Sequence, residues 1–160
     1  MSLQKHIDNV KDFCHKAGQP VPTEKTYPTI KARELRARLI LEEALEMVEA
    51  LGFVLIKKDI EDDVIGSADD FEYQCVGPLD HIGVMDAAVD LLWVGVTGPA
   101  VLCGLSDKLE ECIEAIDQNN LEKFKSGHRC EVTGKWIKSP NHKKPNLESI
   151  INNEKELPNT

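Results

Sequence analysis

Apolar residues recur every three or four positions in four stretches of the chain, the spacing that gathers side chains on one face of a helix. In the first stretch Ile7, Val10 and Cys14 follow it. A Ser, Thr or Asp suited to cap a helix N-terminus precedes or opens each stretch. The predicted helices span residues 2–17, 30–57, a third from about residue 80 and a fourth from 106 to Gly127, with Ser2, Thr29, Asp80 and Ser106 as their caps.

The segments between these stretches predict little further regular structure. Residues 19–28 hold three prolines and predict an extended connector. Residues 58–80 predict a charged loop with a helical turn, and Gly98-Pro99 should kink or break the third helix. Residues 129–138 alternate around Thr133-Gly134, which predicts a small hairpin, and the last eight residues should be frayed. The fold class is therefore an all-α bundle of four main helices with a small C-terminal hairpin.

The second predicted helix carries an acidic stripe. Glu42, Glu46 and Glu49 share one face, and Glu43 flanks Glu46 three positions away. Like charges at these spacings destabilise a helix, so a bound cation is a natural compensation, although a solvated acidic face is the simpler interpretation. At about 28 residues this helix would be roughly 40 Å long, which suggests that it spans the molecule or reaches a partner subunit.

The third predicted helix is apolar on nearly every side except at Asp86 and Asp90, which stand one turn apart. Carboxylates in a buried helix are costly unless they are paired or bound to metal. If this helix packs against the acidic one, the oxygens converge into the surroundings that Mg²⁺ or Mn²⁺ prefers. The alternative is a set of buried salt bridges from these aspartates to Arg33, Arg36 or Arg38.

Composition narrows the class of protein. A chain of 160 residues predicts one domain, with a core over about residues 2–150. The formal charge of −9 argues against a nucleic-acid binder. No run of eighteen uncharged apolar residues and no signal-peptide core are present, which predicts a soluble cytoplasmic protein away from membranes. The five cysteines contain no C-x-x-C pair, so we expect reduced core thiols, and His128-x-Cys130 lacks the second pair of a zinc site.

The combination of motifs resembles a known family. Glu42-Glu43-x-x-Glu46 followed by Asp86-x-x-x-Asp90 is similar to the all-α nucleoside triphosphate pyrophosphohydrolases, which include MazG, the dimeric dUTPases and phosphoribosyl-ATP pyrophosphohydrolase. Over about residues 8–150 the chain further resembles a phage and bacterial branch of phosphoribosyl-ATP pyrophosphohydrolase-like proteins. The segments that carry this likeness are 10–13, 18–22, 36–43, 86–93, 120–123 and 138–141.

The resemblance implies a MazG-like bundle in which Glu42, Glu43, Glu46 and Asp90 bind Mg²⁺, while Asn120 and Lys123 reach the phosphates. It also implies an obligate oligomer, a homodimer or homotetramer, with sites close to subunit interfaces. Many relatives carry an acid at the position of Ala87, so Asp86 is the substitute expected here. A solvated lysine near a helix end is the simpler interpretation of Lys123.

The expected reaction is hydrolysis of a nucleoside triphosphate to a monophosphate and pyrophosphate, by water attacking the α-phosphorus. Metal would be held by Glu43, Glu46, Asp86 and Asp90, with Glu42 as a further ligand or as the base that orients the water. Other substrate contacts are expected as follows: Arg36, Arg38, Lys138 and Lys144 at the phosphates, and Asn9 and Trp93 at the base. Trp93 and Phe13 also suit a core, and the basic tail also suits a solubilising role.

Analogy with phage relatives favours dGTP or GTP as the substrate, and leaves deoxyuridine triphosphate and phosphoribosyl-ATP open. A phage-encoded chain would act in the host cytoplasm. Two other classes of function remain at this stage. One is a helical oligomer that binds nucleotide or metal without catalysis, and the other is a structural bundle whose carboxylates pair with arginines.

Overall fold

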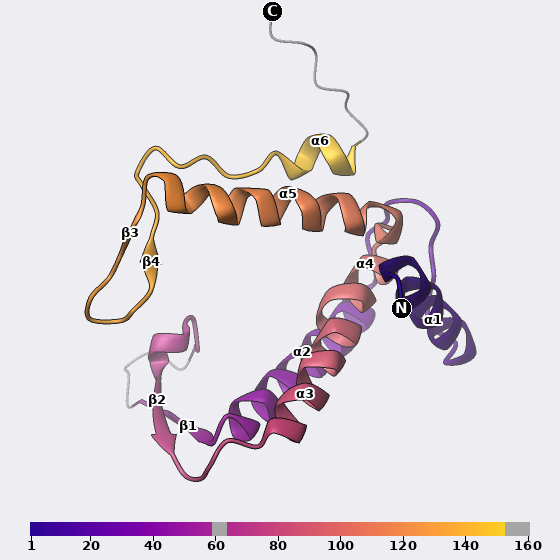
Figure 1. The fold of residues 1–160 in the computed structure, drawn as a ribbon. Coiled ribbons are helices and arrows are strands. Elements are labelled where there is room, and N and C mark those ends of the chain that lie inside the picture. Colours follow the sequence, from indigo (N-terminus) through magenta and orange to yellow (C-terminus); the bar gives the residue numbers. More distant parts are fainter. Residues whose placement is uncertain (59–63, 153–160) are drawn as a thin grey trace, which may run out of the picture.

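The computed structural model describes residues 1–58 and 64–152, so the expected frayed terminus lies outside the described residues. The chain is mostly helical, with two small hairpins (Figure 1). In chain order the elements are α1 (Leu3–Lys16), α2 (Ile30–Ala50), β1 (Phe53–Lys57), η1 (Ala68–Asp70), β2 (Phe71–Cys75), α3 (His81–Asp90), η2 (Leu91–Thr97), α4 (Gly98–Leu102), η3 (Ser106–Lys108), α5 (Leu109–Glu122), η4 (Lys123–Lys125), β3 (His128–Arg129), β4 (Trp136–Ile137) and α6 (Leu147–Ile151).

Three of the four expected helix caps are confirmed. The side chains of Ser2, Thr29 and Asp80 accept hydrogen bonds from backbone amides in the first turns of α1, α2 and α3, at 3.3, 3.2 and 3.0 Å. The prediction for Ser106 is wrong. Ser106 is buried inside η3, a 3₁₀ turn that precedes α5, and it makes no capping bond. The chain enters α5 through this tighter turn, which leaves Lys108 at the N-cap position.

The predicted second helix is too long by seven residues. α2 ends at Ala50 and not at residue 57, because Gly52 adopts a φ of 86°, a left-handed conformation that closes helices. The Gly52 amide donates to the Glu49 carbonyl at 2.8 Å, in place of a continuing helical bond. At 21 residues α2 is roughly 32 Å long, so helix length gives no support for a partner subunit.

Residues 53–57 form a strand because aromatic and β-branched residues follow one another there. β1 pairs antiparallel with β2, with Phe53 opposite Cys75 and Lys57 opposite Phe71. A charged loop with a helical turn is the prediction for residues 58–80, of which 59–63 lie outside the described residues. The turn is present as η1, but the strand that follows it was missed.

The third helix is not broken at Gly98-Pro99. η2 is a π-helix in which the Gly98 amide donates to the Trp93 carbonyl five residues back. Pro99 follows at the start of α4, and the wider π-helical turn before it accommodates a residue that has no amide proton to donate. His81–Leu102 is thus one continuous helix, long and apolar enough to cross a membrane by length and composition alone, a test that core helices of soluble proteins also meet.

α2 lies along α3 and η2, and α1 packs across α4 and η2 (Figure 1). The buried centre lies at α1 and α4, where Val10, Cys14 and Val101 meet with Val21 and Trp93 against them. α5 leaves this layer and makes its main contacts with the neighbouring η3, η4 and α6. The expected C-terminal hairpin is confirmed, since β3 pairs with β4 around Gly134. Within the described residues, only six hydrophobic side chains are buried.

Gly104 provides a test of how the connector is held to the end of α4. Its φ is +69°, and a β-carbon there would overlap the Glu24 carbonyl oxygen. We expect Gly104→Ala to lower the free energy of unfolding by about 3 kcal/mol, measured by chemical denaturation. Gly18→Ala is the matched control, because Gly18 has a φ of +67° with no atom near the missing β-carbon. It should cost only about 1 kcal/mol of backbone strain, and equal losses for the two variants would contradict this contact.

Candidate functional site

The packing of α2 against α3 gathers five carboxylates from the two helices. α3 approaches α2 closely at Gly83, where a β-carbon would lie 3.1 Å from that of Ala50. Further along the pair, the Glu43 carboxyl lies within electrostatic range of four other acids. We refer to these five residues, all expected from the sequence, as the acid cluster: Glu42, Glu43 and Glu46 on α2, with Asp86 and Asp90 on α3.

Glu43 is the central member of the acid cluster. Burial raises the pKa of its carboxyl, and repulsion from Glu46, Asp90, Glu42 and Asp86 raises this pKa further, in that order. Its Oε2 atom is buried and has no hydrogen-bond partner. A covered carboxylate oxygen without a partner costs free energy, and the neighbouring negative charges increase that cost. The fold therefore maintains an uncompensated concentration of negative charge between α2 and α3.

The arginines of α2 do not compensate this charge. Arg38 pairs with Glu34 one turn away, at 2.8 Å on the helix surface. Arg36 donates to Gln19 at 3.3 Å and lies against Gly98, on the side of α2 that faces the connector and α4. In residues 1–58 and 64–152, no ion pair joins an arginine to the acid cluster. The arrangement of arginine-paired aspartates, left open by the sequence, is not found in this part of the chain.

The acid cluster is a set of neighbours and not a finished coordination shell. Among the residues that the structure describes, no three His, Cys, Asp or Glu side chains are already arranged to hold an ion. Glu42, Glu46 and Asp86 are exposed, whereas Glu43 and Asp90 are half-buried. Exposed carboxylates change rotamer readily, so the cluster has the mobility to close around a cation.

Asn120 and Lys123 lie far from the acid cluster within one chain. The Lys123 ammonium donates to the Asn120 side-chain oxygen at the end of α5. The Lys123 carbonyl accepts from the Trp136 indole at 2.9 Å, which fixes the β3–β4 hairpin to this end of the helix. Figure 1 shows α5 and α2–α3 on opposite sides of an open centre. Lys138 and Lys144 are exposed beyond β4, on the α5 side.

The two residues expected at a nucleobase have different surroundings. Asn9 is exposed on α1. The Trp93 ring is half-buried and meets the rings of His6 and Phe13 edge-on, at centroid distances of 5.5 and 5.8 Å. Such edge-to-face contacts are typical of a packed core. Trp93 thus has the core environment that was the alternative to a nucleobase contact.

The cysteines depart from the expected core positions. All five are free thiols, as predicted, but only Cys14 is buried and Cys75 is exposed on β2. Burial raises the pKa of Cys14, while Arg36 nearby opposes that rise. In the C-terminal hairpin, hydrogen bonding to Thr133 lowers the pKa of the Cys130 thiol. The strand at residues 71–75 was not predicted, so the exposure of Cys75 could not be anticipated.

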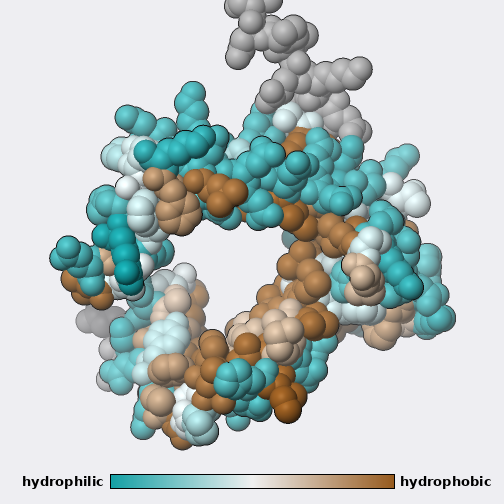
Figure 2. All heavy atoms as spheres, viewed as in Figure 1, coloured by the Kyte–Doolittle hydropathy of each residue, from teal (hydrophilic) through white to brown (hydrophobic). Residues whose placement is uncertain are grey.

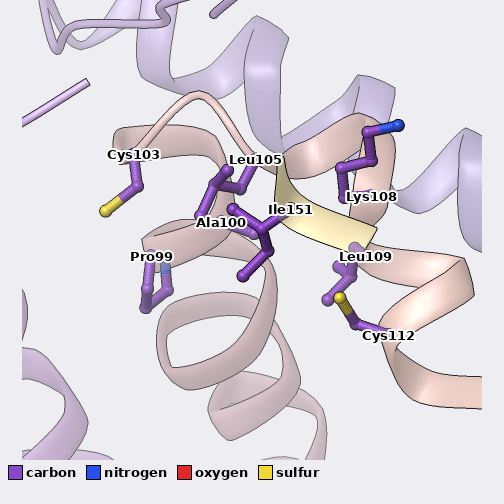
Figure 3. Close-up of a pocket in the computed structure, with 8 residues that line it drawn as sticks. All are labelled: Pro99, Ala100, Cys103, Leu105, Lys108, Leu109, Cys112 and Ile151. Carbon is purple, nitrogen blue, oxygen red and sulfur yellow. The ribbon is translucent and has the colours of Figure 1, made fainter. Parts of the chain in front are cut away.

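A second concave site, unexpected from the sequence, lies where α4 turns into α5 (Figure 3). It encloses about 240 Å³ and is lined by Pro99, Ala100, Cys103, Leu105, Lys108, Leu109, Cys112 and Ile151. Apart from Lys108 the lining is apolar or thiol, so it lacks the acids that a metal site needs and the set of donors that a triphosphate needs. The apolar spacing of Leu109 and Cys112 was the available signal, and it indicated a helix face only.

No model of a known protein family matches the sequence, and no curated protein compared with it is similar enough to count as a relative. The likeness to pyrophosphohydrolases therefore stays a prediction.

Replacing the central carboxyl tests whether the cluster is under electrostatic strain. Because the folded protein raises the pKa of Glu43, the ionised carboxyl opposes folding, and this penalty grows as the pH rises through that raised pKa. We expect Glu43→Gln to raise the unfolding temperature of the metal-free protein at pH 7 by about 2–4 °C. Glu114→Gln, an exposed site on α5, removes the same charge and should change it by less than about 1 °C. A lower unfolding temperature for Glu43→Gln would show that this carboxyl is compensated.

Proposed function

We propose that the chain is a metal-dependent nucleoside triphosphate pyrophosphohydrolase, which converts a (deoxy)nucleoside triphosphate and water to the monophosphate and pyrophosphate. The observation that supports this most directly is the buried, unpartnered Glu43 oxygen among four other carboxylates of α2 and α3. A protein maintains such a cost where an absent positive group normally compensates it.

A hard divalent cation fits this group of residues. All five members of the acid cluster offer carboxylate oxygens, which suit Mg²⁺ or Mn²⁺, and neither sulfur nor imidazole is among them. Glu42, Glu43, Glu46, Asp86 and Asp90 would hold the ion. When bound, it would supply Lewis-acid polarisation of phosphoryl oxygens and lower the pKa of a coordinated water.

We assign the other parts of the reaction to the chain's own residues. Glu42 is exposed beside the half-buried Glu43, where a carboxylate can accept the proton of the attacking water. Lys123 and Asn120 form one polar group at the end of α5, suited to the charge of the leaving pyrophosphate. Arg36 is left out of these phosphate contacts, because its guanidinium faces Gln19 and Gly98.

The negative charge of the chain bears on how a triphosphate substrate approaches the site. A triphosphate brings about four negative charges to a chain of net charge −9, so approach requires cations at the site. We place dGTP or GTP first among substrates, by analogy with the family that the motifs resemble. We further propose a cytoplasmic homodimer or homotetramer, which binds neither nucleic acid nor membrane.

A pyrophosphate-release panel tests the reaction. All ribo- and deoxynucleoside triphosphates, dUTP and phosphoribosyl-ATP are supplied with Mg²⁺ or Mn²⁺. We expect one or a few to turn over, and Glu46→Gln to lower kcat/KM by about 100-fold or more because it removes a metal ligand. Glu114→Gln should match the wild type. Nucleotide binding without pyrophosphate release would instead identify a non-catalytic binding protein.

A second experiment tests whether Lys123 contacts the phosphates of the substrate. Loss of a charged hydrogen bond to phosphate costs about 1.5–3 kcal/mol, so Lys123→Ala should raise KM by about 10- to 100-fold. Lys125→Ala is the matched control, since Lys125 lies two residues further and pairs with Glu122 at 3.4 Å. If both variants changed KM alike, the effect would be one of general charge and not of a specific phosphate contact.

A further inference from the structure

The concave site where α4 turns into α5, called the α4–α5 cavity from here on, is built from segments far apart in the chain. The end of α4 and the first turns of α5 form its walls, and Ile151 of α6 closes it. Next to Ile151, the Asn152 side chain accepts a hydrogen bond from Lys25 of the connector at 2.6 Å, which holds α6 in place. The volume of about 240 Å³ exceeds that of an apolar cavity of about 150 Å³ that binds benzene. A small apolar molecule therefore fits in it.

The apolar lining continues from the α4–α5 cavity along α5 as a groove. Leu109, Cys112, Ile113 and Ile116 recur at the spacing that places side chains on one face of a helix. They line a second hollow of about 280 Å³, which shares Leu109 and Cys112 with the cavity. Figure 2 shows hydrophobic side chains (brown) beneath α5 and on the side of α3 and α4. Because α5 rises by about 10 Å from Leu109 to Ile116, the joined space is elongated and favours an extended apolar chain over a compact ring.

Lys108 gives this elongated space its polarity. Among the described residues that line the α4–α5 cavity, it is the only charged one. In Figure 3 its ammonium points away from the other labelled side chains, so that its apolar stem lines the cavity and its charge lies at the rim. Burial and Glu111 raise the pKa of the Cys112 thiol, and the nearby Lys108 charge opposes that rise. The charged residue at the other end of the groove is Asp117, so an anionic group is favoured at the Lys108 end.

A third hollow, of about 300 Å³, adjoins the cavity beside Lys108 and gives room for a polar head group. Its described lining holds two lysines, Lys25 and Lys108, and two acids, Glu24 and Asp107, which balance in formal charge. Lys108 is the only one of these four that also lines the apolar cavity. It is therefore the charge nearest to the place where an apolar body would end.

We propose that the α4–α5 cavity and the groove along α5 bind a linear apolar chain that carries one carboxylate, a ligand of the fatty-acid class. The chain occupies the cavity and the groove, and its burial supplies most of the binding free energy. The carboxylate accepts a charge-assisted hydrogen bond from the Lys108 ammonium at the rim. No residue of the acid cluster lines this site, so the proposal does not depend on the function proposed above.

Calorimetric titration of the full chain with matched single-chain ligands tests the class of ligand. We expect decanoate to bind, and decanol to bind about 10-fold more weakly or worse because it lacks the charge. Decylamine should bind most weakly, since its ammonium repels that of Lys108. All three are titrated below the concentrations at which they aggregate. Failure of decanoate to bind, or decylamine binding as tightly as decanoate, would overturn the proposal.

Three variants test whether the ligand lies in this site. Ala100→Leu fills the cavity and should abolish decanoate binding without lowering the unfolding temperature. Lys108→Gln should weaken decanoate binding by about 10- to 100-fold and leave decanol binding unchanged. Lys125→Gln removes the same charge on η4, where Lys125 pairs with Glu122, and should bind decanoate as wild type does. Equal effects of the two lysine variants, or wild-type binding by Ala100→Leu, would contradict the assignment.

The cysteines of the chain provide an independent measurement. Cys103 and Cys112 line the cavity, whereas Cys75 is exposed on β2. Decanoate at about ten times its Kd should slow the alkylation of Cys103 and Cys112 by a maleimide about 10-fold, because only the unliganded fraction reacts. The alkylation of Cys75 should not change. Equal slowing at all three thiols would show non-specific binding, and slowing by phospholipid vesicles but not by free decanoate would indicate a membrane surface; either result would refute the proposed site.

Discussion

Repulsion among the five carboxylates between α2 and α3 is the constraint on which the rest of the structure depends. The contacts between these two helices bring the acids together, so the same packing that stabilises the fold also creates an electrostatic cost. Glu43 carries most of that cost, because its Oε2 atom is covered and unpartnered. Within the described residues no ion pair joins an arginine of α2 to this cluster; Arg38 pairs with Glu34, and Arg36 donates to Gln19. Function is the simplest reason for a fold to keep such an arrangement.

The position of Arg36 shows how the two sides of α2 are divided. Its guanidinium fills the space that Gly98 leaves by having no side chain, at the start of α4. The π-helical turn of η2 allows the helix to pass Pro99 without breaking, and this keeps α3 and α4 in one line. α2 therefore carries the acid cluster where it packs on α3 and places Arg36 against Gly98 at the start of α4. A break at Gly98-Pro99 would have uncoupled these two contacts.

Local signals in the sequence were sufficient for much of the fold and for the acid cluster. Ser2, Thr29 and Asp80 cap their helices because a cap depends only on the next few residues. The end of α2 was misplaced because residues 53–57 suit a helix face as well as a strand, and pairing with β2, whose partners lie 14 to 22 residues away, decides between them. Helical spacing predicted that five carboxylates lie together, namely Glu42, Glu43, Glu46, Asp86 and Asp90. It could not show that Glu43 is the one with a buried oxygen, because this depends on how closely α2 and α3 pack.

The separation of Lys123 and Asn120 from the acid cluster had no signal in the sequence, since spacing along one chain does not tell which chain a helix packs on. Whether a helix packs within its own chain or on a second copy also decides how stable the fold is. A chain with so few buried hydrophobic side chains has little hydrophobic stabilisation of its own, and its exposed apolar helices would stabilise it only when covered. If a second copy supplies that cover, folding, assembly and completion of the site become one event. The cost at Glu43 would then be balanced by contacts that exist only in the assembled protein, which would explain how a small domain tolerates five neighbouring carboxylates.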